Sequence, residues 1–146
     1  MDRVLVTGGC GFIGSNFIHY LLDKDPSVAV INFDRLTYAG NPANLADLAD
    51  HPRYHFLQGD IADADAVRKV VGGGIHAIIN FAAESHVDRS IHDAAPFVRT
   101  NIAGTQVLLD AAREFQVSRY LQVSTDEVYG SLGPTGYFTE ETPLGP

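Results

Sequence analysis

Cysteine and basic residues are scarce in this chain of 146 residues, and each shortage excludes a class of function. Cys10 is the only cysteine, so the chain can form neither an internal disulfide nor a cysteine-rich metal site, which fits a reducing cytoplasm. Ten Lys and Arg residues stand against eighteen Asp and Glu residues, and the net charge is -8. Because nucleic-acid phosphates are held by clustered basic side chains, we expect no nucleic-acid partner.

Long hydrophobic runs are also missing. No apolar run approaches the ~18 residues that a membrane-spanning helix needs. The N-terminus enters an apolar run directly, with neither a charged leader nor a cleavage site, so we expect no signal peptide and no membrane partner. His51 and His55 have the spacing of metal ligands on a helix, but Pro52 spoils that geometry, and we expect no metal.

The chain does contain a regular alternation of short apolar runs and stretches with helical periodicity. The apolar runs are typical of strands buried on both faces of a parallel sheet, and they cover residues 4–6, 28–33, 54–57, 77–81 and 120–123. From Gly130 onward the chain has no period and is expected to be loop.

Three helices are predicted between these strands. The first carries Ile13, Phe17, Leu21 and Leu22 at helical spacing. The second is capped by Asp63 and ends at residues 72–74, which are all glycine. The third is long and opens near Pro96, with a buried stripe made of Val98, Ile102, Leu108, Leu109, Ala112 and Phe115.

This order predicts an α/β fold, a Rossmann-type doubly wound parallel sheet with helices on both faces and the strand order 3-2-1-4-5. We interpret residues 1–146 as one domain of this kind.

A glycine-rich turn, Thr7-Gly8-Gly9-Cys10-Gly11-Phe12-Ile13-Gly14, lies between the first predicted strand and the first predicted helix. In such turns one glycine makes a sharp bend, one lets the backbone approach a pyrophosphate, and one lets the helix pack closely on the sheet. Free amides at the helix start, together with the helix dipole, then hold the anion. We interpret it as a dinucleotide-binding turn, and a plain glycine turn is the alternative.

Asp34 ends the second predicted strand, twenty positions after Gly14. A carboxylate there can accept hydrogen bonds from both ribose hydroxyls of an adenosine and repels a 2′-phosphate, which favours NAD over NADP. Arg35 is the opposing signal, because an arginine can bind a 2′-phosphate. With Asp34 present, we interpret Arg35 as lying near the adenine or in solvent, and a turn-forming Asp34 is the alternative.

Three further segments narrow the interpretation: residues 34–41 (DRLTYAGN), 82–90 (AAESHVDRS) and 124–130 (STDEVYG). Together with the glycine turn they resemble the dTDP-glucose 4,6-dehydratases of the extended short-chain dehydrogenase/reductase family. The third segment is the most discriminating, because related epimerases usually carry small residues in place of Asp126 and Glu127. The resemblance runs from Val4 to about Pro143, and it covers the N-terminal half of such an enzyme.

The resemblance implies an NAD site and a nucleotide-sugar site at the carboxyl ends of the strands, in an enzyme that is a cytoplasmic homodimer. The residues implied for NAD are Gly8, Gly11, Phe12, Ile13, Gly14, Asp34, Arg35, Leu36, Thr37, Asp60, Ile61, Phe81, Ala82, Ala83, Ser85 and Thr100. Among them, Phe12 and Ile13 are placed at the pyrophosphate, and Asp60 and Ile61 beside the adenine. The residues implied for the sugar are Glu84, Ser85 and Thr125.

For catalysis the resemblance implies Thr125, Asp126 and Glu127. Hydride leaves sugar carbon-4 for NAD, Glu127 removes the carbon-5 proton while Asp126 protonates the departing carbon-6 hydroxyl, and hydride returns to carbon-6. Thr125 bonds to the carbon-4 oxygen. Two adjacent carboxyls can be given different pKa values, one acting as acid and one as base, and a solvated turn is the alternative.

The oxidation step of this family also needs a Tyr-x-x-x-Lys pair, in which the lysine lowers the pKa of the tyrosine. Tyr20 and Lys24 have this spacing but lie at the far end of the first predicted helix, so we expect Tyr20 to pack and Lys24 to face solvent. We expect the true pair and the rest of the sugar site beyond Pro146, and these 146 residues alone to be inactive. Two alternatives stay open: an NAD-dependent nucleotide-sugar epimerase or decarboxylase of the same family, and an NAD-binding module without catalysis.

Overall fold

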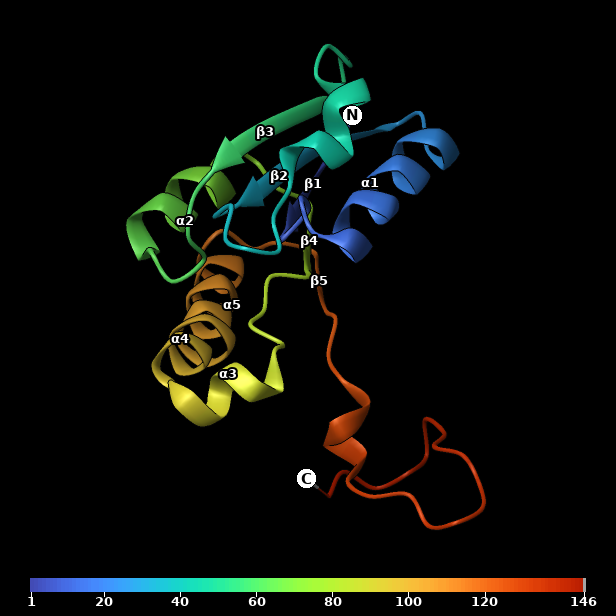
Figure 1. Ribbon diagram of the computed structural model, residues 1–146. Coiled ribbons are helices and arrows are strands. Elements are labelled where there is room, and N and C mark those ends of the chain that lie inside the picture. Colours follow the sequence, from blue (N-terminus) through green and yellow to red (C-terminus); the bar gives the residue numbers. More distant parts are fainter. Residues whose placement is uncertain (146) are drawn as a thin grey trace.

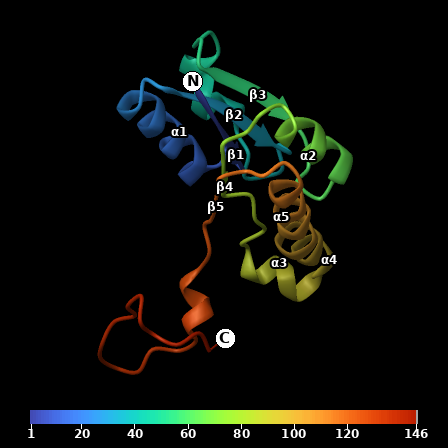
Figure 2. The same cartoon turned by 180° about the vertical axis from the view of Figure 1, so that it is seen from behind.

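The computed structural model describes residues 1–145, except for the side chains of residues 87 and 89, and it shows a five-stranded sheet between two layers of helices (Figures 1 and 2). The strands are β1 (Asp2–Thr7), β2 (Val28–Asp34), β3 (Tyr54–Gln58), β4 (Ala77–Asn80) and β5 (Arg119–Gln122). Every neighbouring pair is parallel, in the order β3-β2-β1-β4-β5. The predicted Rossmann-type fold and strand order are confirmed.

The connections between the strands are mostly helical. The α-helices are α1 (Phe12–Lys24), α2 (Ala64–Val71), α3 (Val87–His92), α4 (Ala95–Phe97) and α5 (Thr105–Glu114). Two 3-10 helices, η1 (Pro42–Leu48) and η3 (Asp126–Tyr129), and a π-helical stretch, η2 (Val98–Gly104), complete the set. No helix in the described part of the chain is long and apolar enough to cross a membrane.

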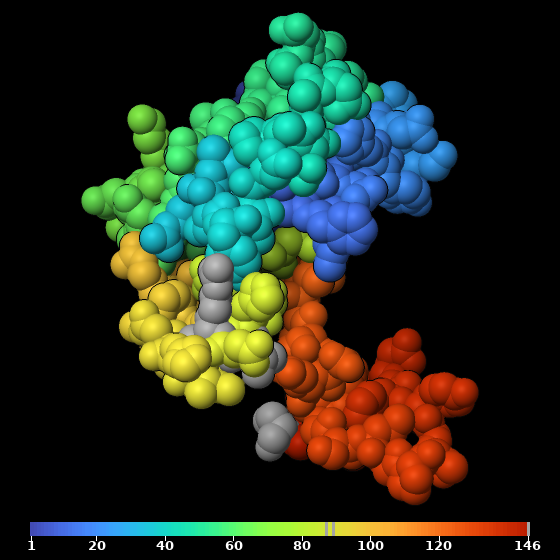
Figure 3. All heavy atoms as spheres, viewed as in Figure 1, coloured from blue at the N-terminus to red at the C-terminus, as the bar shows by residue number. Residues whose placement is uncertain are grey.

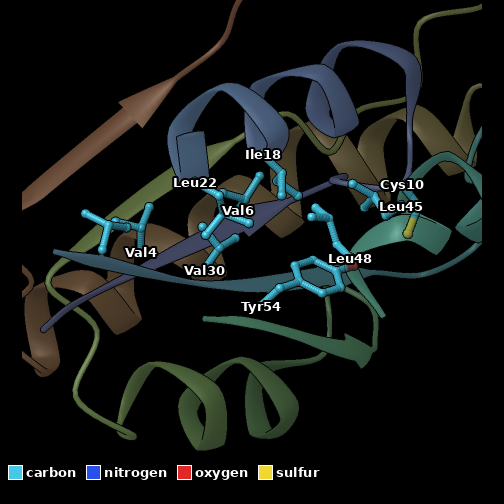
Figure 4. Packing of buried hydrophobic residues seen from close by; sticks show 10 residues of the cluster. Val4, Val6, Cys10, Ile18, Leu22, Val30, Leu45, Leu48 and Tyr54 are labelled. Atoms are coloured by element: carbon cyan, nitrogen blue, oxygen red, sulfur yellow. The ribbon is translucent and has the colours of Figure 1, made fainter. Parts of the chain in front are cut away.

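Two hydrophobic clusters lie on opposite faces of the sheet, because side chains alternate between the faces along each strand. In β1, Val4 and Val6 belong to the cluster under α1 and η1, which Figure 4 shows from close by. Leu5 belongs to the other cluster, under α2 and α5, with Val67 and Leu108. Both faces of the central strands are therefore buried, as the apolar runs predicted.

The prediction of full burial is wrong for the two edge strands. In β3 only Tyr54 is buried, and β5 has no buried residue. Each of these strands has a sheet neighbour on one side only, so the neighbouring strand and helix layers cover it incompletely. Apolar character in the sequence does not distinguish an edge strand from a central one.

The long helix opens close to the predicted residue, but its predicted buried stripe is wrong in part. Leu108 and Ala112 are buried, whereas Val98, Ile102 and Leu109 are 52%, 66% and 45% exposed, and Phe115 is 39% exposed. The helical segment runs without a break from α4 through η2 to α5, and its π-helical middle does not follow the 3.6-residue period that the stripe assumed. The second helix is as predicted, since the Asp63 side chain accepts from the amides of Asp65 and Ala66, and Gly72 ends it.

Helix η1, which the sequence did not predict, is hydrogen-bonded to the glycine turn. Asn41 caps it by accepting from the Ala43 amide, and Pro42 occupies its first position. The Cys10 carbonyl accepts from the Asn41 amide at 3.0 Å and from the Asn44 side chain at 3.0 Å. The turn is therefore held from the outside as well as from the sheet.

Arg53 joins the end of α1 to the starts of β2 and β3. Its guanidinium donates to the carbonyl oxygens of Leu22 (2.6 Å), Asp25 (2.8 Å) and Val28 (2.9 Å). The Leu22 and Asp25 carbonyls lie at the C-terminal end of α1, where a cation also complements the helix dipole, and the Val28 carbonyl belongs to the first residue of β2.

We expect Arg53→Met to lower the free energy of unfolding by about 2 kcal/mol, because it leaves three carbonyls without their charged donor. Arg53→Lys should recover only part of the loss, since an ammonium group cannot reproduce the planar fork. Urea unfolding midpoints measure both variants. Arg113→Met is the matched control, because the Arg113 side chain is 85% exposed, and an equal loss there would contradict this role of Arg53.

Candidate functional site

A cleft opens at the carboxyl ends of the first four strands, next to the glycine turn. It is lined by Gly8, Gly11, Phe33, Asp34, Arg35, Thr37, Ala39, Gly40, Gly59, Asp60, Ile61, Phe81, Ala82, Ala83, Glu84 and Thr100. We call it the first cleft. Eleven of the residues predicted to bind NAD line it, although they come from five separate segments of the chain.

The glycine turn forms one side of the first cleft, and its close packing explains the glycines at positions 8 and 14. Gly8 has a φ of +67°, and a Cβ there would lie 2.7 Å from the Ala82 nitrogen. A Cβ on Gly14 would overlap the Gly8 carbonyl oxygen and lie 2.8 Å from the Gly9 Cα. Gly14 is buried under the turn and does not line the cleft.

Gly9 has a further packing role that the motif did not reveal. A Cβ at Gly9 would overlap the Asn32 side chain and lie 2.6 Å from the Ile18 Cδ1. Asn32 is fully buried in β2 and donates to the Tyr54 hydroxyl at 2.9 Å and to the Cys10 sulfur at 3.3 Å. Burial raises the pKa of the Cys10 thiol, which therefore stays protonated and unreactive at neutral pH.

The start of α1 is open to a ligand. No side chain caps the helix at Gly11, so its first amides keep free hydrogen-bonding capacity. Phe12 and Ile13 are 82% and 62% exposed, although both were predicted to be site residues and Ile13 also to lie on the buried face of the helix. The buried face is instead formed by Gly14, Ser15, Ile18 and Leu22. An uncapped helix start is a ready anion site.

Asp34 joins the glycine turn to the loop after β2. The carboxylate is buried, and it accepts from the Cys10 amide at 2.9 Å and from the Leu36 amide at 2.7 Å. Asp34 thus has the structural role of a turn-forming residue, and it still lines the first cleft. Leu36, which was predicted at the cofactor, has a φ of 60° and packs against the hydrophobic cluster under α1 instead.

Asp60 follows β3 on the wall of the first cleft and lies between two arginines. Its Oδ2 accepts from Arg99 Nη2 at 2.9 Å and lies 3.6 Å from Arg35 Nε, and its Oδ1 accepts from the Ala62 amide at 2.9 Å. Burial raises the pKa of Asp60, but the Ala62 amide and the two guanidinium groups outweigh this, so the pKa lies below its ordinary value. Asp60 is therefore ionised at neutral pH. Arg35 thus forms an ion pair with Asp60. No feature of the sequence had indicated that Arg99 is part of the site.

A second cleft shares Ala82, Ala83 and Glu84 with the first. It is lined by these three residues and by Ser85, Ser90, Phe97, Asn101, Thr105, Gln122, Val123, Ser124, Thr125 and Glu127. In Figure 3 the yellow residues near α3 and the orange residues that follow β5 lie on the same face of the molecule. Of the residues predicted for sugar binding and catalysis, Glu84, Ser85, Thr125 and Glu127 line this cleft, and Asp126 does not.

Asn101 fixes the wall between the two clefts. Its side-chain oxygen accepts from the Glu84 amide at 2.9 Å, and its side-chain nitrogen donates to the Glu84 carbonyl oxygen at 2.9 Å. The partner of Asn101 is therefore the backbone of the loop after β4.

The carboxyl pair stands on the segment that leaves β5 and extends away from the sheet (Figure 1). Thr125 caps η3 by accepting from the Glu127 amide at 3.3 Å, and its hydroxyl lies 3.4 Å from an Asp126 oxygen. Both carboxyl side chains are exposed. The structure thus brings Thr125 and Glu127 to the second cleft, and it leaves the Asp126 carboxylate beside the Thr125 hydroxyl.

A chain of polar side chains, of which Thr7 and Asn80 are fully buried, supports the strand ends beneath the two clefts. The Thr7 hydroxyl bonds to the Asn80 side-chain oxygen, and the Asn80 nitrogen donates to Gln122 at 2.8 Å. The Tyr120 hydroxyl donates to the same Gln122 oxygen at 2.9 Å, and burial raises the Tyr120 pKa. A satisfied chain of this kind fixes β1, β4 and β5 relative to one another.

The residues that the sequence analysis excluded from catalysis and metal binding do not line either cleft. Tyr20 is 60% exposed, so the expectation that it packs is wrong, and Lys24 pairs with exposed Asp23 at 2.9 Å. His51 accepts from the Arg53 amide through Nδ1. Among the residues that the structure describes, no group of three His, Cys, Asp or Glu side chains is arranged to hold a metal ion.

Comparison with known proteins gives consistent matches. The family model described as GDP-mannose 4,6 dehydratase matches residues 5–146. The low-salt glycan biosynthesis protein Agl12 of Haloferax volcanii is 57% identical over 98% of this chain, and a dTDP-glucose 4,6-dehydratase of Streptomyces griseus is 55% identical over 99%. The crystal structure of DesIV, a dTDP-glucose 4,6-dehydratase from Streptomyces venezuelae with NAD bound, matches with a TM-score of 0.90 and 52% identity, over 99% of this chain and 45% of DesIV. This chain spans only 45% and 44% of the length of the first two relatives.

Proposed function

Because the chain belongs to the GDP-mannose 4,6 dehydratase family, we propose that it is the cofactor-binding part of an NAD-dependent nucleotide-sugar 4,6-dehydratase, a lyase that converts dTDP-glucose to a dTDP-4-keto-6-deoxy sugar. Relatives named dTDP-glucose 4,6-dehydratase, 46% to 55% identical to this chain, support this substrate. The observation that carries the proposal is the pair of joined clefts, one beside a glycine turn and one lined by Thr125 and Glu127.

The first cleft has the features that a dinucleotide requires. The uncapped start of α1 and the glycine turn would hold the pyrophosphate, the Asp34 carboxylate would accept from a ribose, and Asp60 and Ile61 would flank the adenine. Asp34 keeps acceptor capacity for this role, since a carboxylate has about four lone-pair sites and two amides use one each. When bound, NAD accepts a hydride from the substrate and later returns it.

The second cleft supplies the proton chemistry. Once sugar carbon-4 is a ketone, the carbon-5 proton is acidic, and Glu127 on the cleft wall would remove it. Asp126 would protonate the departing carbon-6 hydroxyl, and the Thr125 hydroxyl would bond to the carbon-4 oxygen. Glu84 lines both clefts, and Ser85 lines the second cleft. These two residues would hold the sugar beside the cofactor.

The main alternative is an epimerase or decarboxylase of the same family. Neither reaction eliminates water, so neither needs an acid beside a base, and the Asp126-Glu127 pair favours the dehydratase. The second alternative is an NAD-binding module without catalysis, and it would have no use for the second cleft. The Tyr-x-x-x-Lys pair of the oxidation step remains a prediction for the rest of the enzyme, as does the inactivity of residues 1–146 alone.

We also propose that the enzyme is a cytoplasmic homodimer. A single buried cysteine fits a reducing compartment. The exposed apolar side chains Val98, Ile102 and Leu109 along the α4–η2–α5 segment support an interface between two copies, because exposed apolar patches mark association sites.

Changing Ile102 to Lys in the full-length protein should shift it from dimer to monomer, because a charge would be buried at the interface. Sedimentation velocity measures the change. Tyr20→Lys is the control, because Tyr20 is 60% exposed and stands on a different helix, α1. An Ile102→Lys protein that stays dimeric at low micromolar concentration would place the interface elsewhere.

Cofactor choice depends on Asp34. We expect the full-length enzyme to bind NAD more tightly than NADP. Asp34→Ala should weaken NAD binding by about tenfold or more, which is the range of a hydrogen bond to a charged group. The same change should reduce the preference for NAD over NADP. Calorimetric titration with both cofactors tests this. Unfolding midpoints must be measured alongside, because Asp34 also holds the Cys10 and Leu36 amides. Tighter NADP binding by the unmodified enzyme would show that Arg35 sets the choice.

The carboxyl pair should act on elimination and not on cofactor binding. In Asp126→Asn and Glu127→Gln we expect near-normal NAD affinity and turnover slower by ~10²–10⁴, the usual contribution of a general acid or base. Oxidation at carbon-4 should persist, so NADH should accumulate in a single turnover followed at 340 nm. Normal turnover by the double variant would reduce the pair to a solvated turn.

A further inference from the structure

We propose that Arg99 is a positioning residue for the adenine end of the cofactor. Its guanidinium fixes the Asp60 carboxylate on the wall of the first cleft, where Asp60 can accept a hydrogen bond from the adenine amino group. This role rests on the proposed function, because it requires a dinucleotide that contains adenine.

Arg99 reaches Asp60 from a different layer of the fold. It stands on η2, whereas Asp60 follows β3 and Arg35 follows β2. Arg99 donates to Asp60 Oδ2 through Nη2 at 2.9 Å and through Nε at 3.3 Å. The Asp60 side chain is 17% exposed and the Arg99 side chain 54%, so the carboxylate lies inside, on the cleft, and the guanidinium covers it from the outside.

The remaining bonding capacity of Asp60 suits a donor in the cleft. Arg99 occupies Oδ2, with Arg35 nearby, and the Ala62 amide takes one site on Oδ1. A carboxylate oxygen has two lone pairs, so Oδ1 can accept one more hydrogen bond. The arginines have only donors and cannot bind an amino group themselves. The neighbouring Asp34 carboxylate is bonded to the Cys10 and Leu36 amides and is assigned to the ribose, so Asp60 is the carboxylate that we assign to the adenine amino group.

Without Arg99, Asp60 would keep one strong bond, to the Ala62 amide, and a half-exposed arginine at 3.6 Å. The carboxylate could then rotate toward solvent. A carboxylate that is free to rotate loses conformational entropy each time a ligand orders it. A hydrogen bond that discriminates between ligands therefore requires an acceptor that is already held in place.

The test compares two dinucleotides in the full-length enzyme, freed of bound cofactor, by calorimetric titration. Nicotinamide hypoxanthine dinucleotide carries an oxo group where NAD has the amino group. The unmodified enzyme should prefer NAD by about tenfold or more, as expected for a hydrogen bond to a charged acceptor. Arg99→Gln should reduce this preference to about threefold or less, mainly by weakening NAD binding, and Arg99→Lys should fall between the two. Arg113→Gln is the control, because Arg113 bonds to Asp110 on α5 and should leave the preference unchanged.

A second measurement shows whether Arg99 acts through Asp60. In an Asp60→Ala background, Arg99→Gln should change NAD affinity by less than about twofold, because two residues that act as one unit do not contribute additively. The role of Arg99 would be overturned if Arg99→Gln lowered the affinity for both dinucleotides equally. It would also be overturned if Arg99→Gln had its full effect on NAD affinity in the Asp60→Ala background. Neither result would contradict the proposed function. Failure of the unmodified enzyme to bind NAD would overturn the proposed function and, with it, this inference.

Discussion

The site depends on the close packing of the glycine turn against the ends of the neighbouring strands. Gly8 lies against the backbone of Ala82, Gly9 against the Asn32 side chain, and Gly14 against Gly8 itself. Each contact is too short for a Cβ atom, so the turn can occupy this place only if all three residues are glycine. This packing brings the start of α1 to the carboxyl edge of the sheet, and the cofactor cleft then follows from the positions of the β2, β3 and β4 loops.

The loops around the cleft are held mainly by side chains that bond to backbone groups. Asp34 holds the amides of Cys10 and Leu36, and Asn101 holds both backbone groups of Glu84. A side chain that satisfies backbone groups can set a loop in one conformation without forming regular secondary structure. As a result, the wall shared by the two clefts is defined by the fold before any ligand binds, which reduces the ordering cost of binding.

The same residues therefore have structural and ligand-facing roles, and substitutions at the site have to be interpreted with this in mind. Asp34 lines the cleft and also fixes the turn, while Asp60 lines the cleft and joins β2, β3 and η2 through two arginines. Glu127 differs from both, because it is exposed on a segment that extends away from the sheet. Changes at the carboxyl pair should thus disturb the structure least and report most directly on chemistry.

The sequence by itself determined the strands, their order and the placement of the glycine turn, which follow from local periodicity, from glycine spacing and from the rule that parallel strands end at one edge. Most of the residues that line the first cleft came from the resemblance of the sequence to a known family. Only the tertiary structure decided which strands are incompletely covered, that Ile102 faces outward from a π-helical stretch, and that Arg99 and Asn101 bond to Asp60 and Glu84. The physical reason is that these are contacts between segments far apart in the chain. A polar side chain on a helix carries no local signal of its partner, and a helical period cannot be counted through a stretch that departs from it.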